Sequence, residues 1–108
     1  MIILKNKDDL SLLIPFPTEV KNEAIRVMTI LYENYTKNNF DGGYIAIIES
    51  LDDVSSLSFD ISTSTYEFVD HISKDYVSIL YLVGTEYAVT VIMPTSLTKE
   101  IFKGGFNL

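Results

Sequence analysis

The chain has 108 residues, a formal charge of −7 and no cysteine. Its length suits one hydrophobic core, so residues 1–108 are expected to form a single domain. Without cysteine, a disulfide framework and all thiolate metal sites are excluded, and 47% hydrophobic with 21% charged residues is typical of a globular protein. The sequence shows no signal peptide or membrane-spanning stretch, and a cytoplasmic location is therefore expected.

The first strong element in chain order is a helix, predicted over residues 18–37. Thr18 follows a Pro-Phe-Pro run and can cap the helix, and Glu19 suits its first turn. Apolar residues then recur at steps of three and four, which predicts one face packed on a sheet. The apolar positions are Val20, Ala24, Val27, Met28, Leu31 and Tyr35, and the polar positions off this stripe are Glu23, Arg26 and Glu33.

Strand patterns begin at Tyr44. Residues 44–48 are apolar throughout, as in an inner strand, and Ser50 can cap a single helical turn after them. In residues 56–62 Leu57, Phe59 and Ile61 alternate with polar residues, which predicts an outer strand with one wet face.

The rest of the chain predicts a further strand, a hairpin and a short helix. Residues 66–72 have strand composition, and residues 76–83 and 87–93 flank a tight turn at Gly84. Residues 96–103 can form a helix ended by two glycines. The expected fold class is α+β: one long N-terminal helix packed on a mainly antiparallel sheet of four to five strands, with a short C-terminal helix.

Acidity is concentrated in the central part of the chain. Residues 38–98 contain nine acids and one base, Lys74, which gives this segment a charge of −8. Such a field repels phosphate, so direct binding to nucleic acid or to a membrane surface is disfavoured, and it attracts basic proteins. The alternative is that the acidity only keeps a small protein in solution.

No residue pattern predicts a catalytic, cofactor or metal site. The lone histidine, His71, follows Asp70 directly in a predicted strand, so their side chains point to opposite faces and cannot form a dyad. Glu49, Asp52 and Asp53 form the densest carboxylate cluster, but they lack the spacing of calcium loops and zinc sites. No enzymatic activity is therefore expected.

The sequence instead predicts a protein-binding surface in the acidic half. Tyrosine is favoured at interfaces because it combines a large contact area with few rotatable bonds and a polar tip. The predicted surface residues are Asp52, Asp53, Asp60, Glu67, Asp70, Asp75, Glu86, Tyr66 and Tyr87.

The run Gly-Tyr-Ile-Ala-Ile-Ile-Glu-Ser-Leu-Asp-Asp at residues 43–53, followed by the hairpin of residues 76–94, resembles bacterial immunity proteins of contact-dependent growth inhibition systems. The resemblance implies a cytoplasmic protein that binds and neutralises one cognate toxin domain, commonly a nuclease. It carries over no functional residue by position. Two alternatives stay open: a small ligand-binding domain or enzyme using Glu49, Asp52 or His71, and an anti-defence protein that mimics DNA.

Overall fold

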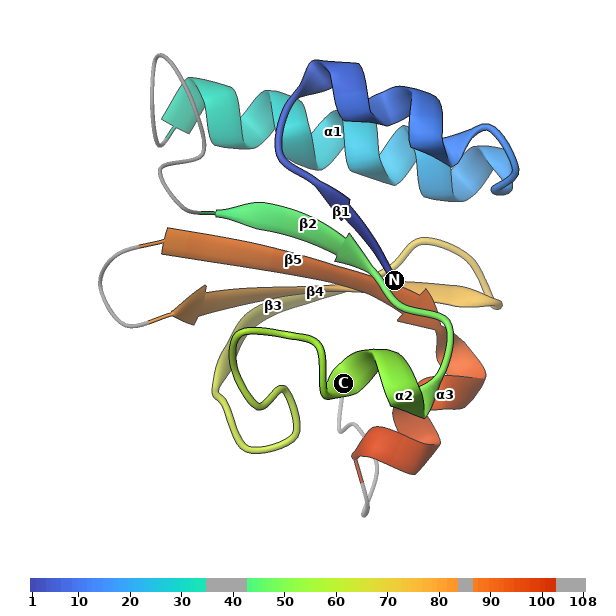
Figure 1. Ribbon diagram of the computed structural model, residues 1–108, viewed down its shortest axis with the longest axis vertical. Helices are drawn as coiled ribbons and strands as arrows, with labels where there is room; N and C mark the ends of the chain where they lie inside the picture. Colours follow the sequence, from blue (N-terminus) through green and yellow to red (C-terminus); the bar gives the residue numbers. More distant parts are fainter. Residues whose placement is uncertain (35–42, 84–86, 103–108) are drawn as a thin grey trace.

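The fold is a five-stranded sheet with helices on one face and irregular chain with two short helices on the other (Figure 1). The computed structural model describes residues 1–34, 43–83 and 87–102, and of residues 31–34 only the backbone. The strands are β1 (Ile2–Leu4), β2 (Tyr44–Ile47), β3 (Tyr66–His71), β4 (Tyr76–Val83) and β5 (Tyr87–Pro94). The helices are the 3-10 helix η1 (Lys7–Leu13), α1 (Thr18–Asn34), α2 (Leu51–Val54) and α3 (Thr95–Ile101).

The sheet is mixed, with the strand order β1-β2-β5-β4-β3. Three pairings are antiparallel, and the central pairing of β2 with β5 is parallel. The α+β class and the number of strands were predicted, but the parallel pair was not. Short connections favour antiparallel neighbours, and that argument holds for the meander β3-β4-β5. The same argument does not apply to β2. After β2 the chain crosses one face of the sheet to the far edge, where β3 lies, and β5 later returns beside β2 in the parallel direction.

The predicted long N-terminal helix needs correction, because it is not the first element of the chain. β1 and η1 come before it, because the three apolar residues of β1 pair with β2, from Ile2 opposite Ile47 to Leu4 opposite Ile45. Within the described residues the helix is α1, Thr18–Asn34, and residues 35–37 of the prediction lie outside them.

Each face of the sheet has its own core. α1 and η1 cover one face, where Val20, Ala24 and Met28 pack with residues of β2 and β5 such as Ile45 and Ile92. These positions confirm the predicted apolar stripe of the helix as far as Met28; the side chains of Leu31 and Tyr35 lie outside the described residues. The second core lies on the opposite face, under α2, residues 55–65 and α3, and contains Ile48, Ile61, Tyr81, Val91 and Leu97.

The strand predicted over residues 56–62 is absent from the structure, in which this segment is irregular and crosses the second face. The alternation was nevertheless informative, because Ile61 is fully buried and Leu57 and Phe59 are partly buried against the second core. Tyrosine hydroxyls anchor the segment instead of a neighbouring strand. Tyr81 Oη donates to the carbonyl oxygen of Ile61 at 2.9 Å, and Tyr44 Oη lies 2.7 Å from Ser58 Oγ.

Within the described residues the C-terminal hairpin is confirmed, and the C-terminal helix is confirmed with different bounds. β4 and β5 pair antiparallel from Tyr76 opposite Pro94 to Val83 opposite Tyr87, while residues 84–86 of the turn lie outside the described residues. α3 buries Leu97 and Ile101 against the second core. α3 ends at Ile101 with Phe102 as its C-cap, two residues before the predicted end, and the two glycines lie outside the described residues.

Candidate protein-binding surface

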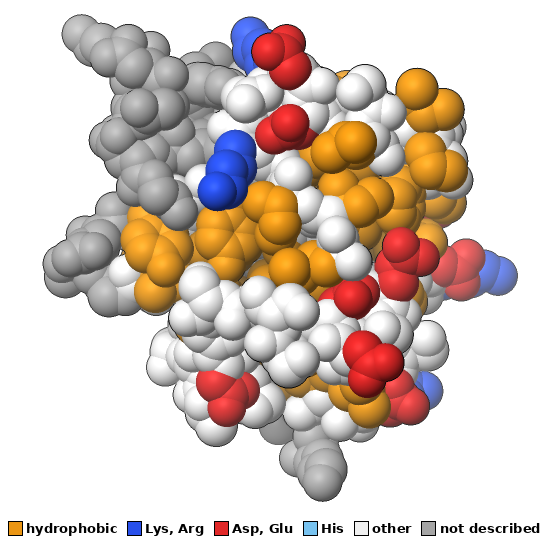
Figure 2. All heavy atoms as spheres, in the orientation of Figure 1, with side chains coloured by type: hydrophobic (Ala, Val, Ile, Leu, Met, Phe, Trp, Pro, Cys, Tyr) orange, Lys and Arg blue, Asp and Glu red, His pale blue; other side chains and the backbone are white. Residues whose placement is uncertain are grey.

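Three of the predicted surface residues, Asp52, Asp53 and Asp75, lie at one end of the sheet together with Glu49. β2 and β5 both point to this end, α2 follows β2 there, and the turn before β4 returns to it because Tyr76 pairs with Pro94. We call these four residues the acidic end. Figure 2 shows acidic side chains gathered over the side of the molecule to which β2 and β5 point in Figure 1.

Within the acidic end, Asp53 has an internal role. Its Oδ1 pairs with the N-terminal amino group of Met1 at 3.2 Å, and its Oδ2 accepts from the backbone N–H of Glu49 at 2.9 Å. The Glu49 hydrogen bond is the main cause that lowers the Asp53 pKa below 3.8. Because the folded-state pKa is depressed, this stabilisation is present above pH 3.8 and is lost as the pH falls through the folded-state pKa.

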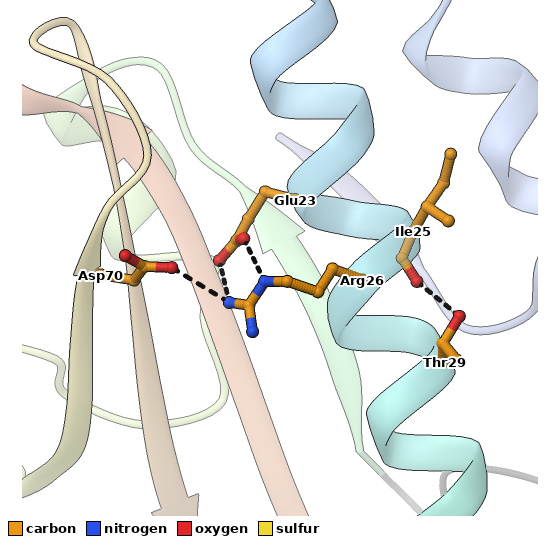
Figure 3. Close-up of polar contacts among 5 residues, drawn as sticks. All are labelled: Glu23, Ile25, Arg26, Thr29 and Asp70. Carbon is orange, nitrogen blue, oxygen red and sulfur yellow. Dashed lines mark hydrogen bonds and ion pairs between the residues drawn. The ribbon is translucent and has the colours of Figure 1, made fainter.

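Asp70 lies on the face of the sheet that α1 covers, where it belongs to a charge network with Glu23 and Arg26 (Figure 3). Arg26 binds both carboxylate oxygens of Glu23 at 2.8 Å, and its Nη2 also lies 3.1 Å from Asp70 Oδ2. The hydrogen bond to Glu23 is the main cause that raises the pKa of Arg26. The prediction that Glu23 lies off the packed stripe is wrong, since its side chain is only 3% exposed. Pairing with Arg26 makes that burial tolerable.

Asp60 lies on the irregular segment, on the face opposite α1. Its Oδ1 accepts from Ser62 twice, from the backbone N–H at 2.9 Å and from Oγ at 2.6 Å. These bonds lower the pKa of Asp60, and the bond from the Ser62 side chain has the largest effect. The exposed carboxyl group is therefore kept ionised. Asp60 is thus a carboxylate held in one orientation at the surface.

Two open hollows flank Phe59 on this side of the molecule. The first, of about 480 Å³, is lined by Leu51, Val54, Ser55, Leu57, Ser58, Phe59 and Asp60. The second, of about 430 Å³, is lined by Phe59, Ser64, Thr65, Glu67, Leu82 and Val83. Each combines apolar walls with a single carboxylate, and both carboxylates, Asp60 and Glu67, belong to the predicted surface.

Aromatic contacts hold Phe59 in place between the hollows. Its ring packs edge-on against Tyr81 at a centroid distance of 4.9 Å, and Tyr66 meets Tyr81 from β3 at 6.5 Å. Burial raises the pKa of Tyr81, so its hydroxyl stays protonated and able to donate. The hydroxyl of Tyr87 lies 3.4 Å from Ser58 Oγ. The two predicted interface tyrosines therefore contact the groups that support this surface.

The structure separates the residues of the alternative enzyme site. Glu49 follows β2 and His71 ends β3, and two strands stand between β2 and β3, which corresponds to roughly 14 Å across the sheet. His71 aligns with Val77, whose side chain belongs to the second core, whereas Asp70 faces α1. Neither hollow is lined by Glu49, Asp52 or His71. Among residues 1–34, 43–83 and 87–102, no three His, Asp or Glu side chains are placed to hold a metal ion.

Sequence reasoning missed the apolar half of this surface. Leu51, Phe59 and Leu82 line the hollows, and none of them was a candidate. The alternation of residues 57–61 indicated that Phe59 is partly buried, but no signal in the sequence shows that it lines two open hollows. Glu86 lies outside the described residues.

No family model matches the chain, and no curated protein or solved structure matches it either. In the described part of the chain, no helix has both the length and the apolar character needed to cross a membrane.

Proposed function

We propose that this chain binds a basic protein domain and neutralises it, in the manner of an immunity protein acting on a cognate toxin. The single observation that supports this role is the pair of hollows beside Phe59, each with apolar walls and one carboxylate. We call Leu51, Val54, residues 55–65, Glu67 and Val83 the coil face. Binding residues are commonly found on such irregular segments carried by a rigid scaffold.

The charge of the chain supports a basic partner. Asp52, Asp60, Glu67 and Asp75 are exposed, while Asp53 and Asp70 have cationic partners within the chain. A net charge of −7 accelerates encounter with a cationic surface, from about 10⁵–10⁶ toward 10⁸–10⁹ M⁻¹s⁻¹ at low salt. A nuclease toxin must present cations to phosphate, which is the surface that an acidic inhibitor can cover.

Affinity in such a complex depends on buried contacts more than on the charged rim. A dissociation constant of about 1 nM corresponds to roughly −12 kcal/mol, and a few well-packed anchors supply most of such a binding energy. On the coil face, Leu51 is 50% exposed, so it has apolar area left to bury. The acidic residues then set the rate of encounter and the choice of partner.

The DNA-mimic alternative has less support. A mimic of DNA presents carboxylates in a regular row, as phosphates are spaced along a strand. Here the acidic residues are divided among the acidic end, the coil face and the Asp70 network under α1. A single basic protein surface can meet the first two of these groups together.

The proposal is tested by co-expressing the chain with basic toxin domains encoded next to its gene and measuring growth and co-purification. We expect one domain to be captured and its toxicity to disappear, and we expect association to slow as salt is raised. Asp60→Asn with Glu67→Gln should weaken capture more than Asp8→Asn with Glu100→Gln, which removes the same charge elsewhere. Rescue without a complex, or reproducible turnover by the purified chain, would refute the proposal.

A further inference from the structure

The two hollows beside Phe59 share one chemical pattern. Leu51, Val54 and Leu57 provide apolar wall in the first, and Val83 provides it in the second, which Leu82 also lines. Asp60 lines only the first hollow and Glu67 only the second, and Phe59 lines both. The pattern is therefore a pair of carboxylate-bearing hollows that share one aromatic wall.

The shared wall and one of the carboxylates are fixed before any partner arrives. Phe59 rests against Tyr81, whose hydroxyl bonds the backbone of Ile61 two residues further along. Asp60 is oriented by both donors of Ser62. A carboxylate offers about four lone-pair positions, two on each oxygen. Ser62 occupies those of Oδ1, so Asp60 accepts hydrogen bonds from a ligand through Oδ2. Groups that are held in place lose little conformational freedom on binding.

Arginine has the chemistry that fits this pattern. Its methylene stem packs on apolar surface while its planar guanidinium stacks on an aromatic ring and donates to a carboxylate. Glu67 can take two parallel hydrogen bonds from it, whereas Asp60 receives it through Oδ2 because Ser62 occupies Oδ1. Lysine carries a compact, strongly hydrated charge that neither forms the bidentate pair nor stacks as a plane. Arginine is also enriched at the energetic centres of protein interfaces.

We propose that the hollows beside Phe59 are paired receptor sites for two arginine side chains of a basic protein partner, with Asp60 and Glu67 as their carboxylates. This rests on the proposed function for the identity of the partner, and it names the side chains that the partner presents. The acidic end then contributes long-range attraction, and the coil face contributes recognition.

The test is a ¹⁵N NMR titration of the purified chain with L-argininamide, compared with L-citrullinamide, which replaces guanidinium by a neutral urea of similar shape. Argininamide should shift the amides of residues 58–64 and of Glu67 with a saturable curve. Asp60→Asn should weaken binding at the first hollow about two- to fivefold, the range of exposed ion pairs, and Glu67→Gln should do the same at the second. Asp75→Asn, with the same loss of charge at the acidic end, should change neither.

Asn at position 60 keeps an acceptor oxygen for Ser62, and Glu67 is exposed on a strand, so both variants are compatible with the folded backbone. Equal shifts with citrullinamide or with L-lysinamide, or shifts centred on the acidic end, would overturn the arginine assignment. The titration contains no toxin, so its failure is separable from a failure of the proposed function. Capture of a toxin without an argininamide response refutes the paired sites alone.

Discussion

The two faces of the sheet are covered in different ways (Figure 1). On one face α1 lays a continuous apolar stripe over β2 and β5, and its Arg26 pairs with Glu23 of the same helix and with Asp70 of β3. On the other face an irregular segment is tied down at a few points by tyrosine hydroxyls. A regular helix covers its face with a continuous row of side chains. The irregular segment instead leaves open hollows, and the carboxylates that line them, Asp60 and Glu67, can still accept hydrogen bonds from a partner.

The largest expected effect tests the packing under α1. Met28 is 2% exposed, and Met28→Ala should lower the free energy of unfolding by about 2–5 kcal/mol, because it leaves a cavity against the sheet. Ile25→Ala, on the exposed side of the same helix, should change it by less than about 0.5 kcal/mol. Urea denaturation measures both. Equal losses would mean that α1 does not pack as described.

The next effect tests the charge network under α1. Arg26→Met leaves the buried Glu23 carboxylate without its partner and should cost about 1–3 kcal/mol. Adding Glu23→Leu should recover most of this loss, because a buried ion pair can often be replaced by apolar residues without penalty. Asp70→Asn should cost less than about 1 kcal/mol, since Asp70 is 38% exposed. If urea denaturation gives Arg26→Met the same free energy of unfolding as the parent chain, the network does not stabilise the fold as described.

The smallest effect tests how the coil face is anchored. Tyr81→Phe removes the donor to the Ile61 carbonyl and should cost about 0.5–1.5 kcal/mol, with faster amide hydrogen exchange confined to residues 55–65. Tyr87→Phe removes only the longer contact to Ser58 and serves as the matched control. If exchange in the coil is unchanged in Tyr81→Phe, the hydroxyl is not what holds the segment.

Much of the fold was predictable because its signals are local. The helical stripe, the hairpin pattern and the helical turn after Ser50 each depend on residues close together in sequence, and each element exists. Ser50 is the N-cap residue of α2, but its side chain makes no capping hydrogen bond. The parallel pairing of β2 with β5 and the three-residue β1 depend on contacts between distant segments, which no local pattern encodes. The alternation at Leu57, Phe59 and Ile61 reports burial correctly, but hydroxyl anchors rather than strand pairing produce it.

Of the candidate site, the sequence predicted only the acidic residues and not the apolar hollows that they line. Asp60 and Glu67 were on the predicted surface, yet so was Asp70, which lies on the other face and pairs with Arg26. Counting charges along a sequence cannot separate acids that meet a partner from acids that meet the chain itself. The hollows arise where side chains leave space unfilled, which is a property of packing and not of residue type.

The most direct test of the central claim is an amide hydrogen-exchange footprint of the chain alone and in complex with the captured basic domain. The account predicts slowed exchange in residues 51–67 and at Leu82 and Val83, with little change over η1 and α1. A footprint confined to η1 and α1, with the coil face exchanging as in the free chain, would contradict it.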